Sequence, residues 1–130
     1  MLEIRQISLL VRDYDEAIEY YTTKLGFTVI GDTRISDEKR WIVIAPHASS
    51  PVNLLLAKAN TPEQVSRIGN QTGNRVFLFL HTDSFEKTYG DFLQNGVEFI
   101  QKPRDEHYGR VVVFKDLYGN KWDLIEKRKD

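Results

Sequence analysis

Hydrophobic and polar positions along the chain follow two periods, which predict a mixture of strands and helices. Short runs rich in Ile, Leu, Val and Phe predict strands, whereas apolar residues spaced by three and four predict helices. The predicted strands cover residues 4–11, 27–30, 41–45, 52–57, 75–81, 97–100, 111–114 and 121–125. The predicted helices begin at Tyr14 and Phe85, and each ends before a glycine, Gly26 or Gly96. Residues 31–39 and 101–109 are polar and predict connections without regular structure.

The residues in front of each helix carry start signals. Asp13 is followed three positions later by Glu16, which is the spacing of a capping box. Either Asp83 or Ser84 is expected to cap the second long helix. Thr61 precedes a proline and a glutamate, a pattern that predicts a further short helix.

The same order of strand, helix, strand, strand, strand occurs twice. The apolar helix positions of the first copy match those of the second at an offset of 71, and the two closing glycines match at 70. The matched helix positions are Tyr14 with Phe85, Ile18 with Tyr89, and Tyr21 with Phe92. Such a repeat predicts two copies of one unit that bury their apolar faces together. We therefore expect a single α+β domain with a first module at about 1–59, a linker at about 60–74 and a second module at about 75–130.

Composition narrows the class of protein. Hydrophobic residues make up 41% and charged residues 28% of the 130 residues, as is typical of a soluble globular chain. The net charge of −1 gives no electrostatic signature of nucleic-acid or anionic-membrane binding, and no stretch approaches about 18 consecutive apolar residues. The absence of cysteine excludes disulfides, thiolate metal sites and cysteine nucleophiles, and it agrees with the expected cytoplasmic location.

The last hairpin, within residues 110–126, contains an acidic residue that needs an explanation. Asp123 lies inside a β-rich run between Trp122 and Leu124, and aspartate is depleted in strands. One interpretation is a solvent-facing position on an alternating strand. The other is a carboxylate that points into a cavity. Gly119 and Asn120 are expected to supply the positive φ that the preceding turn requires.

Motifs at both ends of the chain resemble the glyoxalase/bleomycin resistance/dioxygenase family of the vicinal oxygen chelate superfamily. The first motif comprises Val11, Asp13, Tyr20, Tyr21, Leu25, Gly26 and Phe27. The second comprises Asp116, Gly119 and Asn120, followed by Trp122, Asp123 and Leu124. The resemblance implies two βαβββ modules whose sheets curl around a cavity, usually in a homodimer. It also implies, for many members, a divalent metal (Mn, Ni, Zn or Fe here) that chelates adjacent oxygens of a small substrate.

The family's metal-ligand positions are only partly filled in this sequence. They fall at Gln6 and Asp123, at Asn53 or Leu55, and at Val76 or Phe77. Phenylalanine, valine and leucine side chains cannot bind a metal, and an asparagine amide is a weak ligand. The unfilled positions favour the absence of a cofactor over a bound divalent metal. His81 is a candidate for a displaced ligand or a base in the cavity, and the alternative is an ordinary exposed histidine at a strand end.

Further candidates are aromatic and cationic. Trp41, Phe77, Phe79 and Trp122 would line the cavity if they face inward, although core packing is the alternative for each. Arg110, with Tyr108 in the polar loop before the hairpin, is a candidate for contacts to an anionic ligand. Arg104 and His107 lie in the same loop, and loop structure is the alternative for all four.

Two hypotheses about function follow. In the first, the protein binds a small molecule in the sheet cavity without a metal, as the bleomycin-resistance branch does. In the second, it is a lyase, isomerase or dioxygenase in which Gln6 and Asp123, completed by Asn53 or His81, hold a metal. A metal-free enzyme that uses Asp123 as a base, and an interaction module whose cavity is filled by its own side chains, are the remaining alternatives.

Overall fold

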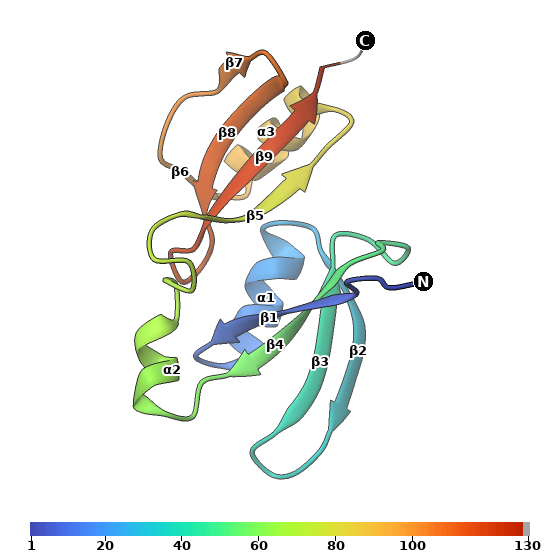
Figure 1. Cartoon of the computed structure of the whole chain (residues 1–130), viewed down its shortest axis with the longest axis vertical. Helices are drawn as coiled ribbons and strands as arrows, with labels where there is room; N and C mark the ends of the chain where they lie inside the picture. The colour runs from blue at the N-terminus through green and yellow to red at the C-terminus, as the bar shows by residue number, and fades with distance from the viewer. Residues whose placement is uncertain (129–130) are drawn as a thin grey trace. The chain divides into compact units, whose positions relative to one another are not determined.

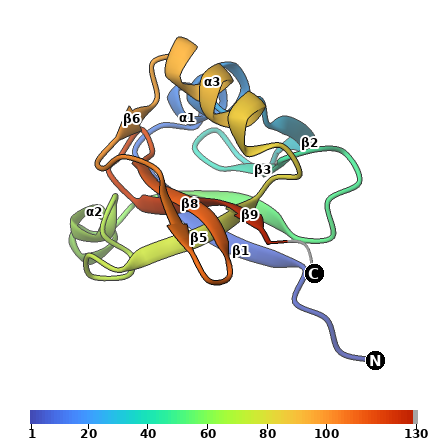
Figure 2. The ribbon, with the colours of Figure 1, turned by 90° about the horizontal axis from the view of Figure 1, so that it is seen from above.

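The computed structural model describes residues 1–128, which form two compact units (Figures 1 and 2). Unit 1 spans Met1–Ile68, and unit 2 begins at Gly69. The division falls inside the segment 60–74, where the sequence predicts a break between modules. Each unit contains a sheet and a long helix that lies against that sheet, so the fold is α+β with mixed sheets of four and five strands.

Unit 1 has the predicted order of elements. They are β1 (Gln6–Val11), α1 (Tyr14–Thr23), β2 (Thr28–Arg34), β3 (Arg40–Ala45), β4 (Asn53–Lys58) and α2 (Pro62–Arg67). The strand order is β1-β4-β3-β2, with β1 and β4 parallel and the other pairs antiparallel. The Asp13 carboxylate caps α1 by accepting a hydrogen bond from the Glu16 backbone N–H at 2.8 Å, which confirms the predicted start of this helix.

The polar segment after residue 30 continues β2, so the prediction of an unstructured connection from 31 to 39 was wrong over its first half. Residues Gly31 to Arg34 pair with β3, and the hairpin closes where the Ile35 N–H donates to the Lys39 carbonyl at 2.8 Å. β2 is the edge strand of its sheet and is exposed along almost its whole length. An edge strand in water needs no apolar alternation, and therefore the sequence carries no strand signal there.

Unit 2 repeats this order and adds one short strand. Its elements are β5 (Val76–His81), α3 (Phe85–Gln94), β6 (Glu98–Phe99), β7 (Arg104–Glu106), β8 (Gly109–Lys115) and β9 (Lys121–Lys127). The strand order is β5-β9-β8-β6, and β7 also pairs with β8. β7 lies in the segment that was predicted to be a loop. Its strand conformation arises from pairing with β8, which a local pattern of polar residues does not show.

The start of α3 differs from the predicted capping. Ser84 occupies the N-cap position, but its side chain makes no capping hydrogen bond. Instead, the Glu126 side chain of β9 accepts a hydrogen bond from the Phe85 backbone N–H at 2.7 Å. A carboxylate from β9 therefore caps α3 in place of the predicted Asp83 or Ser84.

The turn between β8 and β9 is organised by a buried carboxylate. Asp116 is 6% exposed and accepts hydrogen bonds from the backbone N–H groups of Tyr118 and Asn120, the Asn120 Nδ2 and the Trp122 Nε1 at 2.9–3.1 Å. Gly119 has a φ of 99°, as predicted. The prediction of a positive φ at Asn120 was wrong, because this residue contributes its hydrogen-bonding amide rather than an unusual backbone conformation.

Candidate functional site

Asp123 lies on β9, on the face of the sheet opposite α3, which we call the far face of unit 2. Its neighbours along the strand, Trp122 and Leu124, face α3, because they pair with Phe114 and Val112 of the helix-facing side of β8. The side chain is 7% exposed, and Oδ1 is buried without a hydrogen-bond partner. Of the two interpretations of Asp123, the solvent-facing one is therefore wrong.

Burial raises the pKa of the Asp123 carboxyl, and the positive charge of Arg104 acts in the opposite direction. Arg104 lies on the far face as well, because it pairs with Val111 of β8. Its guanidinium donates to Glu106 Oε1 at 2.9 Å and to the Gln101 side chain, and it is hydrogen-bonded to Tyr108. Arg104 is thus held by residues of its own segment, and its charge acts on a carboxyl whose pKa is raised by burial.

The predicted site residues of β5 differ in how they pair with β9. Phe79 pairs with Asp123 and His81 pairs with Ile125, so both lie on the far face. Phe79 is 61% exposed. Phe77 falls in a register shift between Val76 and Leu78 and has no regular partner on β9. The register therefore places Phe79, rather than Val76 or Phe77, beside the acidic position of the last strand.

Two predicted ligand contacts lie on the other side of this sheet. Trp122 is 2% exposed, stacks on Phe114 at 5.7 Å and donates its indole N–H to Asp116. Arg110 lies over the Phe85 ring at 5.2 Å and pairs with Glu86 of α3 at 3.3 Å. We assign both side chains a role in packing α3 against its sheet.

In unit 1, the corresponding sheet face carries two amides. Gln6 and Asn53 are partners across the parallel strands β1 and β4, so their side chains share one face. This face is opposite α1, since Leu54 and Leu56, which alternate with Asn53, belong to the buried core. Asn53 Oδ1 is buried and has no hydrogen-bond partner.

The side chains at the family's metal-ligand positions are mostly weak metal ligands. Unit 1 offers two neutral amides at these positions, and unit 2 offers Asp123 beside the ring of Phe79. Within residues 1–128, no group of three or more His, Cys, Asp or Glu side chains is arranged to hold a metal ion. Amide oxygens are weak ligands, and protein metal sites normally use three or more strong ones.

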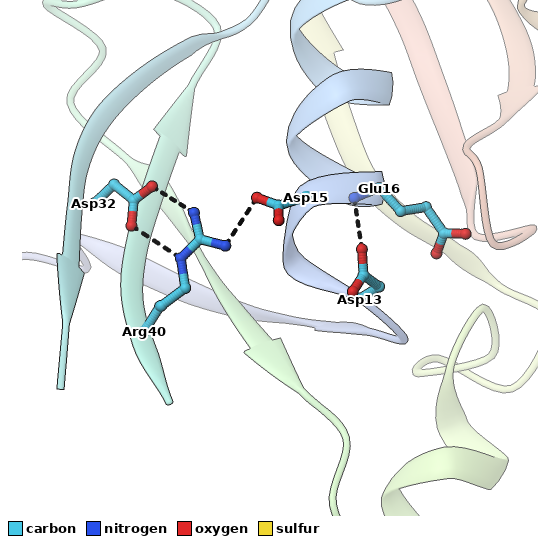
Figure 3. Close-up of polar contacts among 5 residues, drawn as sticks. All are labelled: Asp13, Asp15, Glu16, Asp32 and Arg40. Atoms are coloured by element: carbon cyan, nitrogen blue, oxygen red, sulfur yellow. Dashed lines mark hydrogen bonds and ion pairs between the residues drawn. The ribbon is translucent and has the colours of Figure 1, made fainter. Parts of the chain in front are cut away.

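Trp41 lies in a pocket of unit 1 with a volume of about 610 Å³. Its side chain is 43% exposed at the start of β3. Next to it, Arg40 is fixed by two carboxylates, Asp32 at 2.7 Å and Asp15 at 2.8 Å (Figure 3). These hydrogen bonds raise the pKa of Arg40, and the bond from Arg40 lowers the pKa of Asp32. The clamp joins β2, β3 and α1 at one edge of the pocket.

Comparison with known proteins places the chain in a family. The model of the Glyoxalase/Bleomycin resistance protein/Dioxygenase superfamily matches residues 3–124. The chain belongs to this superfamily. The predicted family and fold class are therefore confirmed.

Relatives within the superfamily match along nearly their whole length. An uncharacterized protein of Shewanella frigidimarina (strain NCIMB 400) is 51% identical over 95% of this chain and 92% of its own. The crystal structure of UcmS2 is similar with a TM-score of 0.82 and 30% identity, covering 96% of this chain and 98% of that one. TnmS3, an antibiotic binding protein from Streptomyces sp. CB03234, has the same fold with a TM-score of 0.79 at 23% identity and 98% coverage of both chains.

Membership in the superfamily accounts for some of the predicted site residues, and the geometry of the structure adds others. The family's ligand positions include Gln6 and Asp123, which both lie on sheet faces away from the helices. Sequence reasoning did not connect Arg104 with Asp123, and it missed the Arg40 clamp and the charged rim of the Trp41 pocket. Most of these charged residues lie at exposed positions, where charge is usual, so no sequence signal separates them from ordinary surface residues. Among the helices that the structure describes, none is long and apolar enough to cross a membrane.

Proposed function

We propose that this superfamily member binds a small molecule directly through side chains on the far faces of its sheets, without the metal used by other members. The observation that carries the proposal is the buried Oδ1 of Asp123, which lacks a hydrogen-bond donor. A buried polar atom without a partner costs about 1–3 kcal/mol, and native structures rarely retain one without a reason. A ligand N–H or O–H group would supply the missing donor.

Two further observations support the proposal. The residues at the family's ligand positions include two amides and a phenylalanine, which suit hydrogen bonding and ring contacts better than metal binding. TnmS3, whose fold this chain shares, is an antibiotic binding protein, which also supports the proposal. Contacts are proposed for Phe79 and His81 beside Asp123, and for Gln6 beside Asn53.

The proposal includes a homodimer in the cytoplasm. Single-domain chains of the type that this sequence resembles are usually homodimers, and a chain without cysteine suits a reducing compartment. Light scattering after size-exclusion chromatography, measured over a range of concentrations, tests the dimer directly.

The experiment is a thermal-shift screen of a panel of antibiotics and other natural products, followed by calorimetric titration of each hit. Asp123→Asn keeps the shape of the side chain but replaces one acceptor oxygen with a donor, and it should weaken binding of a hit at least tenfold. Asp105→Asn, an exposed change on β7, is the matched control. A hit whose affinity is the same in both variants would contradict a role for Asp123 in binding. Restoration of binding by added Mn²⁺, Ni²⁺, Zn²⁺ or Fe²⁺ would favour a metalloenzyme.

One observation favours a second candidate, a metal-free lyase or isomerase with Asp123 as general base. A carboxylate whose pKa is raised by burial, with one oxygen not engaged by hydrogen bonds, is suited to accept a proton. This candidate predicts that Asp123→Asn abolishes turnover of a substrate while its binding persists. The first proposal predicts that the protein binds the ligand and that the ligand is recovered without chemical change.

A further inference from the structure

The pocket of unit 1 opens where two neighbouring strands stop pairing. β3 pairs with β2 along its whole length, and β4 pairs with β1 along its whole length. Between β3 and β4, however, only Val43 with Leu55 and Ile44 with Leu54 are partners. Arg40 and Trp41 on one strand, and Ala57 and Lys58 on the other, therefore face each other without a ladder and line the pocket of about 610 Å³.

This pocket begins two residues along β4 from the far-face amide Asn53 and extends away from it to the end of the strand. Asn53 lies at the start of β4 and Lys58 at its end, a separation of about 16 Å at the usual rise of a strand. The volume falls within the range of roughly 300–1,000 Å³ that is typical of small-molecule sites. The α2 residue Gln64 and the β2–β3 turn residues Glu38 and Lys39 complete its rim.

The charged side chains at the rim that lack an ion pair favour an anionic ligand. Arg40 is paired with both Asp32 and Asp15, so this clamp carries a net charge of −1 and leaves no cation for a ligand. Lys39 and Lys58 form no ion pair with any residue that the structure describes, and neither does Glu38, so two ammonium groups and one carboxylate of the rim are left to interact with a ligand. A ligand carboxylate can pair with these two ammonium groups, whereas Glu38 would oppose it.

The walls of the pocket favour a flat, apolar ligand. The half-exposed Trp41 ring offers a flat apolar surface, and Leu55 and Ala57 continue it on the opposite strand. Aromatic rings favour stacked or edge-to-face contact with such a surface. The strand edges beside the gap present backbone N–H and C=O groups to polar substituents.

We propose that this pocket is a second ligand site, which binds a planar aromatic carboxylate. The ring of the ligand stacks on Trp41, and its carboxylate pairs with Lys58 and Lys39 at the rim. The site lies within unit 1 and does not use Asp123, the residue that carries the proposed function, so variants of Lys58 and of Asp123 distinguish the two proposals.

The test is fluorine NMR of the full chain labelled with 5-fluorotryptophan. The protein has two tryptophans, so Trp41→Phe assigns both resonances. 2-Naphthoate is the probe, and its methyl ester and a neutral sugar, glucose, are the comparators. The acid should shift the Trp41 resonance in a saturable manner, whereas the buried Trp122 resonance should stay in place.

Charge variants then test the assigned contacts. Lys58→Gln and Lys39→Gln should each weaken 2-naphthoate binding by roughly two- to fivefold, the effect of one exposed ion pair. Glu38→Gln should strengthen it, because it removes the opposing charge. Lys102→Gln, an exposed change in unit 2, is the control for general electrostatics, and Asp123→Asn should leave naphthoate binding unchanged.

Three results would overturn the inference. They are equal binding of the ester and the acid, tighter binding of glucose than of the acid, and a Trp41 resonance that does not move at millimolar naphthoate. A shift confined to Trp122 would also place the ligand outside this pocket.

Discussion

Asn53 and Asp123 lie 70 residues apart on the last strands of unit 1 and unit 2, and each buries one side-chain oxygen that has no hydrogen-bond partner. The same offset relates the glycines that close the two long helices. Asn53 and Asp123 have different partners on the first strand of their unit. Asn53 lies beside Gln6, and Asp123 lies beside Phe79. The repeat thus keeps a polar position on each far face while changing its chemistry from a neutral amide to a carboxyl.

The raised pKa of Asp123 predicts a particular dependence of stability on pH. A carboxyl whose pKa is higher in the folded than in the unfolded chain favours folding below its unfolded pKa of about 3.9 and loses that contribution as pH rises through the folded value. Asp123→Asn, which stays neutral, should therefore gain stability relative to the wild type as pH rises from about 4 through that value, and the difference should then stay constant.

The measurement is urea unfolding of both proteins at a series of pH values, read as the difference in free energy of unfolding. Each unit by which the pKa is raised corresponds to about 1.4 kcal/mol of that difference. A variant that loses stability relative to the wild type over the same pH range would mean that Arg104 outweighs burial and lowers the pKa of Asp123.

Asp116 should be far more important for stability than its place in a surface turn suggests. Asp116→Asn preserves volume but leaves one acceptor oxygen for buried donors that include the Trp122 indole N–H. Because unpaired buried donors are costly, we expect a loss of about 2–3 kcal/mol in the free energy of unfolding. Urea unfolding followed by tryptophan fluorescence measures it. The exposed control Asp105→Asn should change stability by less than about 0.5 kcal/mol.

Glu126 should act as the cap of α3 although it is distant in sequence. Glu126→Ala removes the acceptor of the Phe85 N–H bond and should cost about 1 kcal/mol, whereas Glu126→Gln, which keeps an acceptor oxygen, should cost less. Amide hydrogen exchange should speed up in the first turn of α3 in the alanine variant. Ser84→Ala, which removes no capping bond, is the informative comparison, and a larger effect there would contradict this assignment.

The sequence predicts the fold well because the repeated strand and helix patterns are local signals. It fails at the end of β2 and at β7, where strand conformation depends on pairing with β3 and β8. Strand alternation already implies that Trp122 and Asp123 cannot line the same face, and the structure confirms that they do not. The burial of Asp123, the Arg104 charge beside it and the gap between β3 and β4 depend on register between distant segments, which no local pattern encodes.

Two glycines with opposite environments give the last prediction. Gly69 has a φ of 76°, and a Cβ built there would lie 1.9 Å from the Tyr118 carbonyl oxygen. Gly90 is an exposed position inside α3 with no atom within 4 Å of a built Cβ. Gly69→Ala should therefore destabilise the protein by about 2 kcal/mol or more, because both backbone strain and the close approach to Tyr118 must be relieved.

Gly90→Ala should stabilise the protein by about 0.5–1 kcal/mol, because alanine loses less backbone entropy in a helix. Thermal unfolding of the two variants beside the wild type checks both signs in one experiment. Equal and small effects would mean that the segment at Gly69 moves away from Tyr118 without cost. The tight approach of the two backbones would then not contribute to the stability of unit 2.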